Sequence, residues 1–251
     1  SDDGRLFGRI SSFFLHPMTF GLFLCLSFIY VLGTKERNKT IINISLLILI
    51  FVNIITCGVR SAIAAILLGA LFYLLLSRKI KIALTAVFLS LVSLYIIPYI
   101  SGLENYIGSI FDFNNARGTV SGSSFDMRFE QLDGCFKEIK DCIFIGKGYG
   151  WCHYYVENNG AHPVLLCFES LFFSVMCQNG IIGLLAYIYM CVRVYKNKYM
   201  CQYEKKYRYI IYTMVFVYLA FSMITGEYGY LKYLLIIYTI FLINNRSVFR
   251  I

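Results

Sequence analysis

Long apolar runs separated by short charged clusters make up most of this chain. A helix needs about 17 to 25 apolar residues to cross roughly 30 Å of hydrocarbon, and most of the runs approach or reach that length. A helix on the surface of a soluble protein would instead carry an apolar stripe on one face only. The pattern therefore predicts seven membrane-spanning helices, over residues 16–33, 41–57, 61–76, 80–100, 166–192, 209–225 and 229–243.

One long polar stretch, residues 101–165, interrupts these runs. Connections of this length are usually functional or disordered. Five apolar residues in its middle follow one another at spacings of four, three, four and three: Phe125, Phe129, Leu132, Phe136 and Ile139. This spacing predicts an amphipathic helix, which either lies on the membrane surface or caps the helix bundle.

Basic residues indicate which ends of the predicted spans face the cytoplasm, because Lys and Arg are enriched on that side. They cluster after the first, third and fifth spans and at the C-terminus. The segments on that side hold 14 Lys or Arg residues against two acids, whereas the other side holds 9 against 12. The net charge of +9 is thus explained by topology and contact with lipids, and nucleic acid is not expected as a partner.

These boundaries divide the chain into three parts. Residues 1–100 hold about four spans behind a short outer segment, residues 101–165 form an extracytoplasmic loop that contains the amphipathic helix, and residues 166–251 hold about three spans. The predicted fold is an all-α, polytopic transmembrane helix bundle with one large extracytoplasmic loop. Because the first span already starts from the outside and the chain begins with Ser1, we expect it to be the C-terminal part of a longer polytopic protein.

Composition agrees with this fold and argues against a metal centre. With 59% apolar and 15% charged residues, a water-soluble surface would be hard to assemble. The nine cysteines include no Cys-x-x-Cys pair and show no metal-ligand spacing with the three histidines. Disulfides are not implied either, although four cysteines on the outer side could pair: Cys135, Cys142, Cys152 and Cys167.

Three charged residues on the predicted outer side are candidates for chemistry. Arg60, at the hinge between the second and third spans, either snorkels to lipid head groups or holds an anionic ligand. Arg128 has no acidic residue three or four positions away, so it is either solvated, paired at a distance, or available to bind a phosphate group. Glu169 opens the fifth span, where a carboxylate is costly unless partnered. It either pairs with an arginine of the bundle or, partly desolvated, accepts a proton near neutral pH.

Further candidates lie in the same loop and before the first span. Alternate glycines in Gly146-Lys147-Gly148-Tyr149-Gly150 allow either a plain turn or close backbone approach to a ligand, which makes Gly148 and Gly150 candidate substrate-binding positions. The spacing is not that of a nucleotide-binding phosphate loop. His162 could assist, although a lone loop histidine is more often incidental. Arg9 could join a cationic cluster on the outer side.

Four short motifs follow one another along the chain: Gly8-Arg9 before His16-Pro17, Gly58-Val59-Arg60-Ser61-Ala62, Met127-Arg128-Phe129, and Ile145-Gly146-Lys147-Gly148-Tyr149-Gly150. This order resembles the C-terminal half of the O-antigen ligase and O-antigen polymerase superfamily of bacterial envelope glycosyltransferases, over nearly the whole chain. Family ligases also carry a histidine, then Asn, Ser or Gln, then nine residues and Gly-x-x-Gly. Here Ser170 precedes Gly180-Ile181-Ile182-Gly183 by nine residues, and Glu169 occupies the histidine position.

The resemblance implies a multi-pass enzyme of the bacterial cytoplasmic membrane with its active site on the extracytoplasmic side. It would transfer a glycan from undecaprenyl pyrophosphate to a sugar hydroxyl, without a nucleotide sugar, a metal or another cofactor. Arg60 and Arg128 would neutralise the pyrophosphate, while Glu169 accepts the proton of the hydroxyl or orients the acceptor. The substrate-binding positions would be Arg9, His162, Gly148, Gly150 and Ser170. The expected partners are the lipid-linked oligosaccharide, membrane lipids, and a chain-length regulator or flippase of the same pathway.

Four functions remain open at this point. A polymerase passes the glycan to another lipid-linked repeat unit, and Glu169 in place of histidine favours it. A ligase passes the glycan to lipid A core or to a protein, and acceptor recognition spread over several loops makes the two hard to separate. A flippase or other transporter would show charged or broken helices near the membrane centre and related halves, and the sequence indicates neither. A non-catalytic envelope assembly or sensing protein is the fourth.

Overall fold

The computed structural model describes most of the predicted helices. The residues described are 12, 14, 16–34, 40–57, 59–78, 125–165, 168, 170–196, 205–225 and 231–243. The span predicted over 80–100, Arg9 and Glu169 lie outside them. For Arg60 and Arg128 only the positions in their helices are described.

Helices coincide with six of the predicted spans: α1 (Pro17–Thr34), α2 (Thr40–Thr56), α3 (Arg60–Leu76), α8 (Leu171–Val192), α9 (Lys205–Ile224) and α10 (Leu231–Ile243). Among the residues described, α1, α8 and α9 are long and apolar enough to cross a membrane, and α2 and α3 are shorter apolar helices. The regular elements of these residues are all helical. The prediction of an all-α membrane helix bundle is therefore confirmed.

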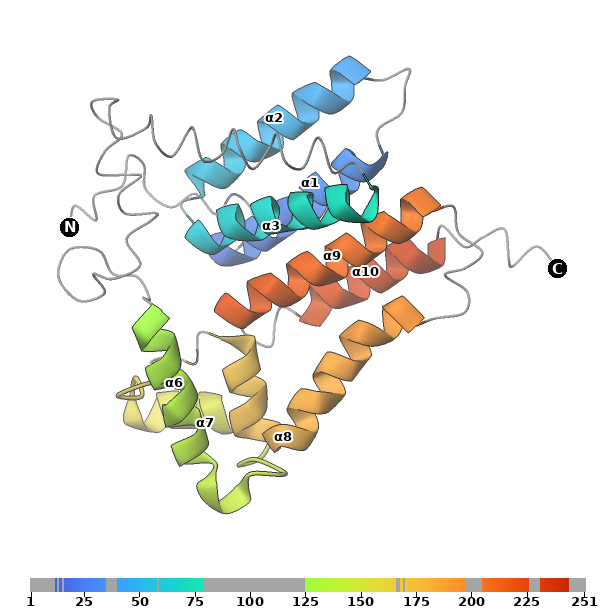
Figure 1. The fold of residues 1–251 in the computed structure, drawn as a ribbon. Coiled ribbons are helices and arrows are strands. Elements are labelled where there is room, and N and C mark those ends of the chain that lie inside the picture. Colours follow the sequence, from blue (N-terminus) through green and yellow to red (C-terminus); the bar gives the residue numbers. More distant parts are fainter. Residues whose placement is uncertain are drawn as a thin grey trace.

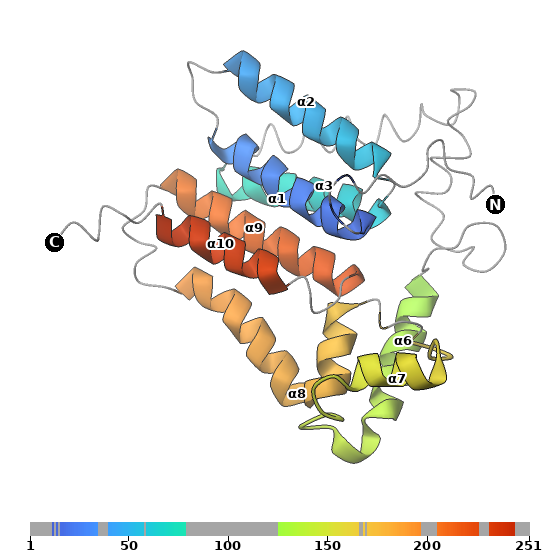
Figure 2. The same ribbon diagram turned by 180° about the vertical axis from the view of Figure 1, so that it is seen from behind.

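The helices of the bundle alternate in direction (Figures 1 and 2). The ends of α1, α3 and α8 and the starts of α2 and α9 therefore lie at one end of the bundle, on the right in Figure 1. These are the helix ends for which the basic clusters predict a cytoplasmic location. The starts of α1, α3 and α10 lie at the opposite end.

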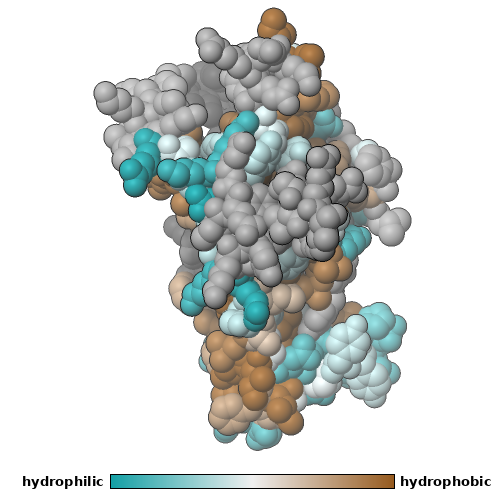
Figure 3. Space-filling model, turned by 90° about the vertical axis from the view of Figure 1, so that its right-hand side faces the viewer, coloured by the Kyte–Doolittle hydropathy of each residue, from teal (hydrophilic) through white to brown (hydrophobic). Residues whose placement is uncertain are grey.

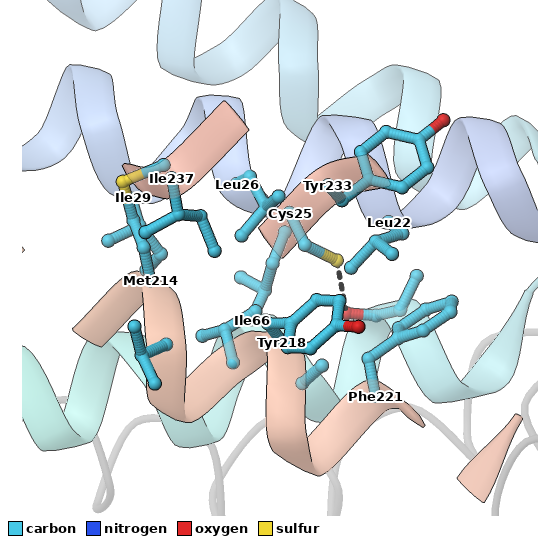
Figure 4. Close-up of a cluster of buried hydrophobic side chains, with 14 of the residues drawn as sticks. Leu22, Cys25, Leu26, Ile29, Ile66, Met214, Tyr218, Phe221, Tyr233 and Ile237 are labelled. Atoms are coloured by element: carbon cyan, nitrogen blue, oxygen red, sulfur yellow. Dashed lines mark hydrogen bonds between the residues drawn. The ribbon is translucent and has the colours of Figure 1, made fainter. Parts of the chain in front are cut away.

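Helix α9 lies at the centre of the bundle, where it contacts α1, α3, α8 and α10. Small residues allow this close approach, since a Cβ atom on Gly33 would collide with Ile210 of α9 and one on Gly69 with Val217. Such contacts are typical of helices in lipid, where van der Waals packing replaces the hydrophobic driving force. Figure 4 shows side chains of this core: Leu22, Cys25, Leu26, Ile29, Ile66, Met214, Tyr218, Phe221, Tyr233 and Ile237.

The predicted span over 166–192 is not one straight helix. Gly180 has φ +64° and ψ −165°, which interrupts α8 and separates a first half, residues 171–179, from a second half, residues 181–192. The two halves form a V in Figures 1 and 2. This break was not predicted from the sequence. The break is possible because the loop over residues 143–148 supplies new hydrogen-bond partners at this point.

The loop region contributes α6 (Phe125–Glu138), the short 3-10 helix η3 (Lys140–Cys142) and α7 (Trp151–Asn159). A second 3-10 helix, η4 (Arg193–Lys196), follows α8. Both α6 and α7 pack on α8. We call α6, η3, α7, the residues that connect them and the first half of α8 the loop unit. Its own core consists of Cys135, Ile139, Cys152, Leu165, Phe168, Met176 and Cys177.

The predicted amphipathic helix exists as α6, but the flank that it buries includes small and polar residues. Gln131, Gly134 and Cys135 are buried, and a Cβ atom on Gly134 would lie 2.8 Å from Cγ1 of Val164. Three residues of the predicted apolar stripe are exposed instead: Phe129 (68%), Leu132 (38%) and Phe136 (42%). Among the described residues this stripe does not cap the bundle. Its exposure fits a helix that lies against lipid.

An apolar surface surrounds the break in α8. Figure 3 shows apolar side chains gathered in the lower part of the molecule, at the height where Figure 1 places the break. Exposed apolar residues of this region are Phe144, Ile145, Ile182 and Leu185. They belong to the loop before α7 and to the second half of α8, two segments that backbone hydrogen bonds join at the break.

Candidate functional site

The loop with alternate glycines docks onto the break in α8 through the backbone. Four hydrogen bonds join the two segments: Ile181 N to Ile143 O (3.0 Å), Ile182 N to Phe144 O (3.2 Å), Lys147 N to Cys177 O (2.9 Å) and Gly148 N to Gln178 O (2.9 Å). They satisfy groups that a continuous helix would pair within itself, and buried groups of this kind must find a partner. The loop and the break thus depend on each other.

Two glycines make this docking possible. Gly146 has φ +68° and Gly180 has φ +64°, a conformation that other residues rarely adopt. A Cβ atom on Gly146 would lie 2.5 Å from the backbone nitrogen of Gly180, and one on Gly180 would collide with the carbonyl of Phe144. The Gly-Lys-Gly segment and the Gly-x-x-Gly segment, which are separate in the sequence, therefore form one structure.

The predicted substrate-binding glycines Gly148 and Gly150 also have positive φ, +102° and +85°. A Cβ atom on either would meet nothing within 4 Å, so conformation and not crowding requires glycine here. Their N–H groups are both used. Gly148 donates to the backbone carbonyl of Gln178, and Gly150 donates to the side-chain oxygen of Gln178. A ligand at this loop would therefore meet its open surface and not these two donors.

The start of α8 is anchored to the end of α9. Ser170, another predicted substrate-binding residue, is buried, and its hydroxyl donates to the carbonyl of Met223 at 2.8 Å. Its side chain does not cap its own helix. Ser170 thus connects the loop unit to the bundle at the position that follows Glu169.

Phe168, on the other side of Glu169, is held in an unusual conformation. Its φ is +54°, which costs a residue with a side chain roughly 1–2 kcal/mol. Its N–H donates to the carbonyl of Leu165 at 2.9 Å, and its carbonyl accepts from the hydroxyl of Ser174 at 3.0 Å. Its ring contacts Trp151, Tyr155 and His162. Backbone strain maintained by many contacts is common at functional sites, and here it lies directly before the predicted catalytic carboxylate.

His162 is buried and serves the loop unit itself. Its Nδ1 accepts from the N–H groups of Val164 (3.1 Å) and Leu165 (3.0 Å), which leaves Nε2 to donate to Oε1 of Glu138 at 3.2 Å. Both ring nitrogens are therefore used by the protein. This arrangement gives His162 the role of orienting the turn that leads to Phe168.

Glu138 joins three segments of the loop unit. One carboxylate oxygen accepts from His162, and the other lies 2.7 Å from Nζ of Lys147. Lys147 also lies over the ring of Trp151, with 4.6 Å between Nζ and the ring centroid. The hydrogen bond from Lys147 holds the pKa of the Glu138 carboxyl below its ordinary value. Sequence reasoning missed Glu138, Lys147 and Gln178, because their partners lie 9 to 28 positions away.

The three predicted catalytic residues lie in the sequence at or next to the starts of helices. Arg60 is the first residue of α3, and Arg128 lies in the first turn of α6. Glu169 falls between Phe168 and Ser170, next to the start of α8, and lies outside the described residues. The starts of α3, α6 and α8 all lie toward the end of the bundle opposite the basic clusters, on the left in Figure 1. A joint site formed by these three side chains stays a prediction.

Comparison with known proteins identifies a family. Residues 44–188 match the family model described as O-antigen ligase. The matched region begins in α2 and includes α3, the loop unit and most of α8. No curated protein and no solved structure matches the chain. Because the matched region covers more than half of the residues, the chain belongs to the O-antigen ligase family.

Proposed function

We propose that this protein is an envelope polysaccharide polymerase for O-antigen, capsule or exopolysaccharide. It transfers a glycan from undecaprenyl pyrophosphate to a hydroxyl of another lipid-linked repeat unit, on the extracytoplasmic face of the bacterial cytoplasmic membrane. Membership of the O-antigen ligase family implies glycan transfer from a lipid-linked oligosaccharide. The observation that carries the choice of a polymerase is Glu169, which stands where family ligases have histidine, directly before Ser170.

The proposed reaction is a single displacement. The acceptor oxygen bonds to the anomeric carbon while the bond from that carbon to the pyrophosphate oxygen breaks, and the proton of the hydroxyl passes to Glu169. Arg60 and Arg128 neutralise the charge that develops on the pyrophosphate. The configuration at the anomeric carbon is inverted. The reaction needs no metal ion in this proposal, because the two guanidinium groups supply the positive charge.

The surroundings of Glu169 support this role. A catalytic base must be held within hydrogen-bond reach of the proton that it accepts. Phe168 is fixed by its ring contacts and by Ser174, and Ser170 is fixed by its bond to Met223. The residue between them is therefore attached to two rigid regions at once, the loop unit and the bundle.

A ligase is the second candidate, because the matching family model is itself described as O-antigen ligase. In that case lipid A core or a protein would be the acceptor. The donor side of the reaction, with Arg60 and Arg128 on the pyrophosphate, would be the same. The two candidates differ only in the acceptor, so a phenotype that reports attachment separates them.

The contacts at the break in α8 do not favour transport. Transporters use broken helices to present free backbone groups to a substrate or an ion. Here, four backbone groups next to the break bond to residues 143–148: the N–H groups of Ile181 and Ile182 and the carbonyls of Cys177 and Gln178. The break in α8 therefore serves to dock the loop unit.

Deletion of the full-length gene, complemented with variants, tests the proposal. We expect Glu169→Gln to leave surface polysaccharide with a single capped repeat, and Glu157→Gln, which removes an exposed acid of α7, to restore long chains. Lipid-linked polymer that accumulates without attachment would establish a ligase instead. Normal chain lengths in Glu169→Gln would overturn the proposed role of this carboxylate.

A further inference from the structure

Three cysteines from three helices meet in the core of the loop unit. Cys135 of α6, Cys152 of α7 and Cys177 of α8 are all buried. The sulfur atoms of Cys135 and Cys177 lie 3.2 Å apart, although the residues are 42 positions apart in the chain. From the sequence, Cys135 belonged to the outer loop and Cys177 to the interior of a span. The break in α8 brings them together, because it separates Cys177 and the first half of α8 from the half that runs beside α9.

We propose that Cys135 and Cys177 form a disulfide bond that joins α6 covalently to the first half of α8. The inference rests on the extracytoplasmic placement of the loop adopted in the proposed function, because disulfides persist in oxidising compartments. A disulfide requires two sulfur atoms about 2.05 Å apart on closely spaced backbones. The two sulfur atoms lie 3.2 Å apart in the folded chain, so they need to approach by only about 1 Å to bond.

The bond forms by thiol–disulfide exchange with an extracytoplasmic oxidoreductase that carries a disulfide of its own. The thiolate of one cysteine attacks a sulfur of that disulfide and gives a mixed disulfide, which the second cysteine then attacks. The two cysteines lose two protons and two electrons, and the oxidoreductase leaves with two thiols. Both sulfurs belong to residues with 0% exposure in the folded chain, so the exchange takes place while α6 docks onto α8.

The sulfur–sulfur distance of 3.2 Å is the observation that favours Cys135 and Cys177 as the pair. The thiols of Cys135 and Cys152 each also lie near a backbone carbonyl of α8, at 3.8 Å from Phe173 O and 3.9 Å from Ser174 O. The carbonyl of Cys177 accepts from the N–H of Lys147, so the proposed bond would fix the turn of α8 on which the glycine loop docks. The disulfide would therefore lock the connection between the loop unit and the break.

The test uses the full-length protein in its native membranes. Free thiols are alkylated in denaturant, disulfides are then reduced, and the released thiols are labelled with a maleimide-polyethylene glycol that shifts the band on a gel. We expect Cys135→Ser and Cys177→Ser each to lose two mass tags relative to the unchanged protein, and the matched variant Cys152→Ser to keep them. A linked peptide that contains Cys135 and Cys177 should appear in the unreduced digest.

Two outcomes would overturn the proposal. One is an unchanged number of tags in Cys135→Ser, and the other is a loss of two tags in Cys152→Ser. Labelling of Tyr154→Cys, at a residue with 64% exposure, by a membrane-impermeant maleimide in intact cells reports the side of the membrane independently. If Tyr154→Cys is labelled from outside the cell while Cys135 and Cys177 are free thiols, the proposed disulfide is contradicted and the extracytoplasmic placement of the loop is not. The chain lengths of the surface polysaccharide test the proposed function separately.

Discussion

The helix bundle around α9 and the loop unit around the break in α8 are held together by different kinds of contact. In the bundle, apolar side chains meet, and small residues such as Gly33 and Gly69 let the helices approach. In the loop unit, backbone groups of one segment bond to those of another, and Glu138 joins three segments. Side-chain packing can adjust to a substitution, whereas the docking of backbone on backbone cannot.

The proposed catalytic carboxylate follows the strained residue of the loop unit and precedes the anchor to the bundle. Phe168 belongs to the core of the loop unit, and Ser170 bonds to the end of α9. A substitution that disrupts either region should therefore change the position of Glu169. In the loop unit it would act through Phe168, and in the bundle through the hydrogen bond of Ser170. Substitutions that disrupt one region at a time test this comparison.

The largest effect is expected for Gly180→Ala. Its dihedral angles, φ +64° and ψ −165°, exclude a side chain almost completely, and its new Cβ would meet the carbonyl of Phe144. We expect a loss of about 3 kcal/mol or more in the free energy of unfolding. The midpoint of thermal unfolding of the detergent-solubilised full-length protein measures it.

Gly160→Ala is the matched control for this substitution. Gly160 ends α7 with nearly the same angles, φ +74° and ψ −158°, but a Cβ there would meet nothing within 4 Å. It shares the conformational strain and lacks the collision. Equal decreases of the midpoint in the two variants would show that docking at Gly180 contributes nothing to stability.

In the bundle, Gly69→Ala should cost about 1–3 kcal/mol, the usual range for overpacking. The added methyl group would collide with Cγ2 of Val217 in α9, which is a side-chain atom. We therefore expect Val217→Ala to restore most of the lost stability in the double variant, as measured by thermal unfolding. Failure of this rescue would remove the contrast with the loop unit, where the opposing atom belongs to the backbone.

The smallest effect is expected for Glu138→Gln, about 1–2 kcal/mol near neutral pH, because the cluster is partly exposed to solvent. The pKa of Glu138 is lowered in the folded state, so its carboxylate stabilises the fold above the unfolded-state pKa of about 4.3. That contribution is lost as the pH falls through the folded-state pKa. Thermal midpoints of the variant and the unchanged protein should therefore converge in acid.

Asp133→Asn provides the comparison for Glu138→Gln. Asp133 pairs with Lys137 one turn along α6, and both side chains are mostly exposed, at 64% and 75%. Exposed pairs of this kind contribute little, so its midpoint should change by less than that of Glu138→Gln. A larger change for Asp133→Asn would contradict the prediction that the contacts of Glu138 with His162 and Lys147 stabilise the fold more than the exposed pair does.

The spans could be predicted because their signal is local. An apolar run long enough for the membrane identifies a helix by itself, and the observed helices coincide with six predicted runs. The alternation of basic and acidic segments likewise identified which helix ends share one end of the bundle. The presence of α6 followed from its spacing. Its buried flank did not, because that flank is selected by small residues that allow contact with α8 and Val164.

The loop unit could not be predicted because its contacts join distant segments. The run over 166–192 is apolar on both sides of the break, and the Asn179-Gly180 pair at the break, a turn signal, was the local indication of it. That Gly146 opposes Gly180 depends on positions 34 residues apart in the printed sequence. The role of His162 depends in the same way on Glu138, 24 positions earlier.

Turnover of an undecaprenyl-pyrophosphate-linked repeat unit by the purified full-length protein tests the central claim most directly. If Glu169 accepts the proton of the attacking hydroxyl, Glu169→Gln should lower the rate of chain elongation by about 10²–10⁴-fold. Its thermal midpoint should remain close to that of the unchanged protein. Elongation at the normal rate by a stably folded Glu169→Gln variant would contradict the assignment of the catalytic base and, with it, the proposed site at the start of α8.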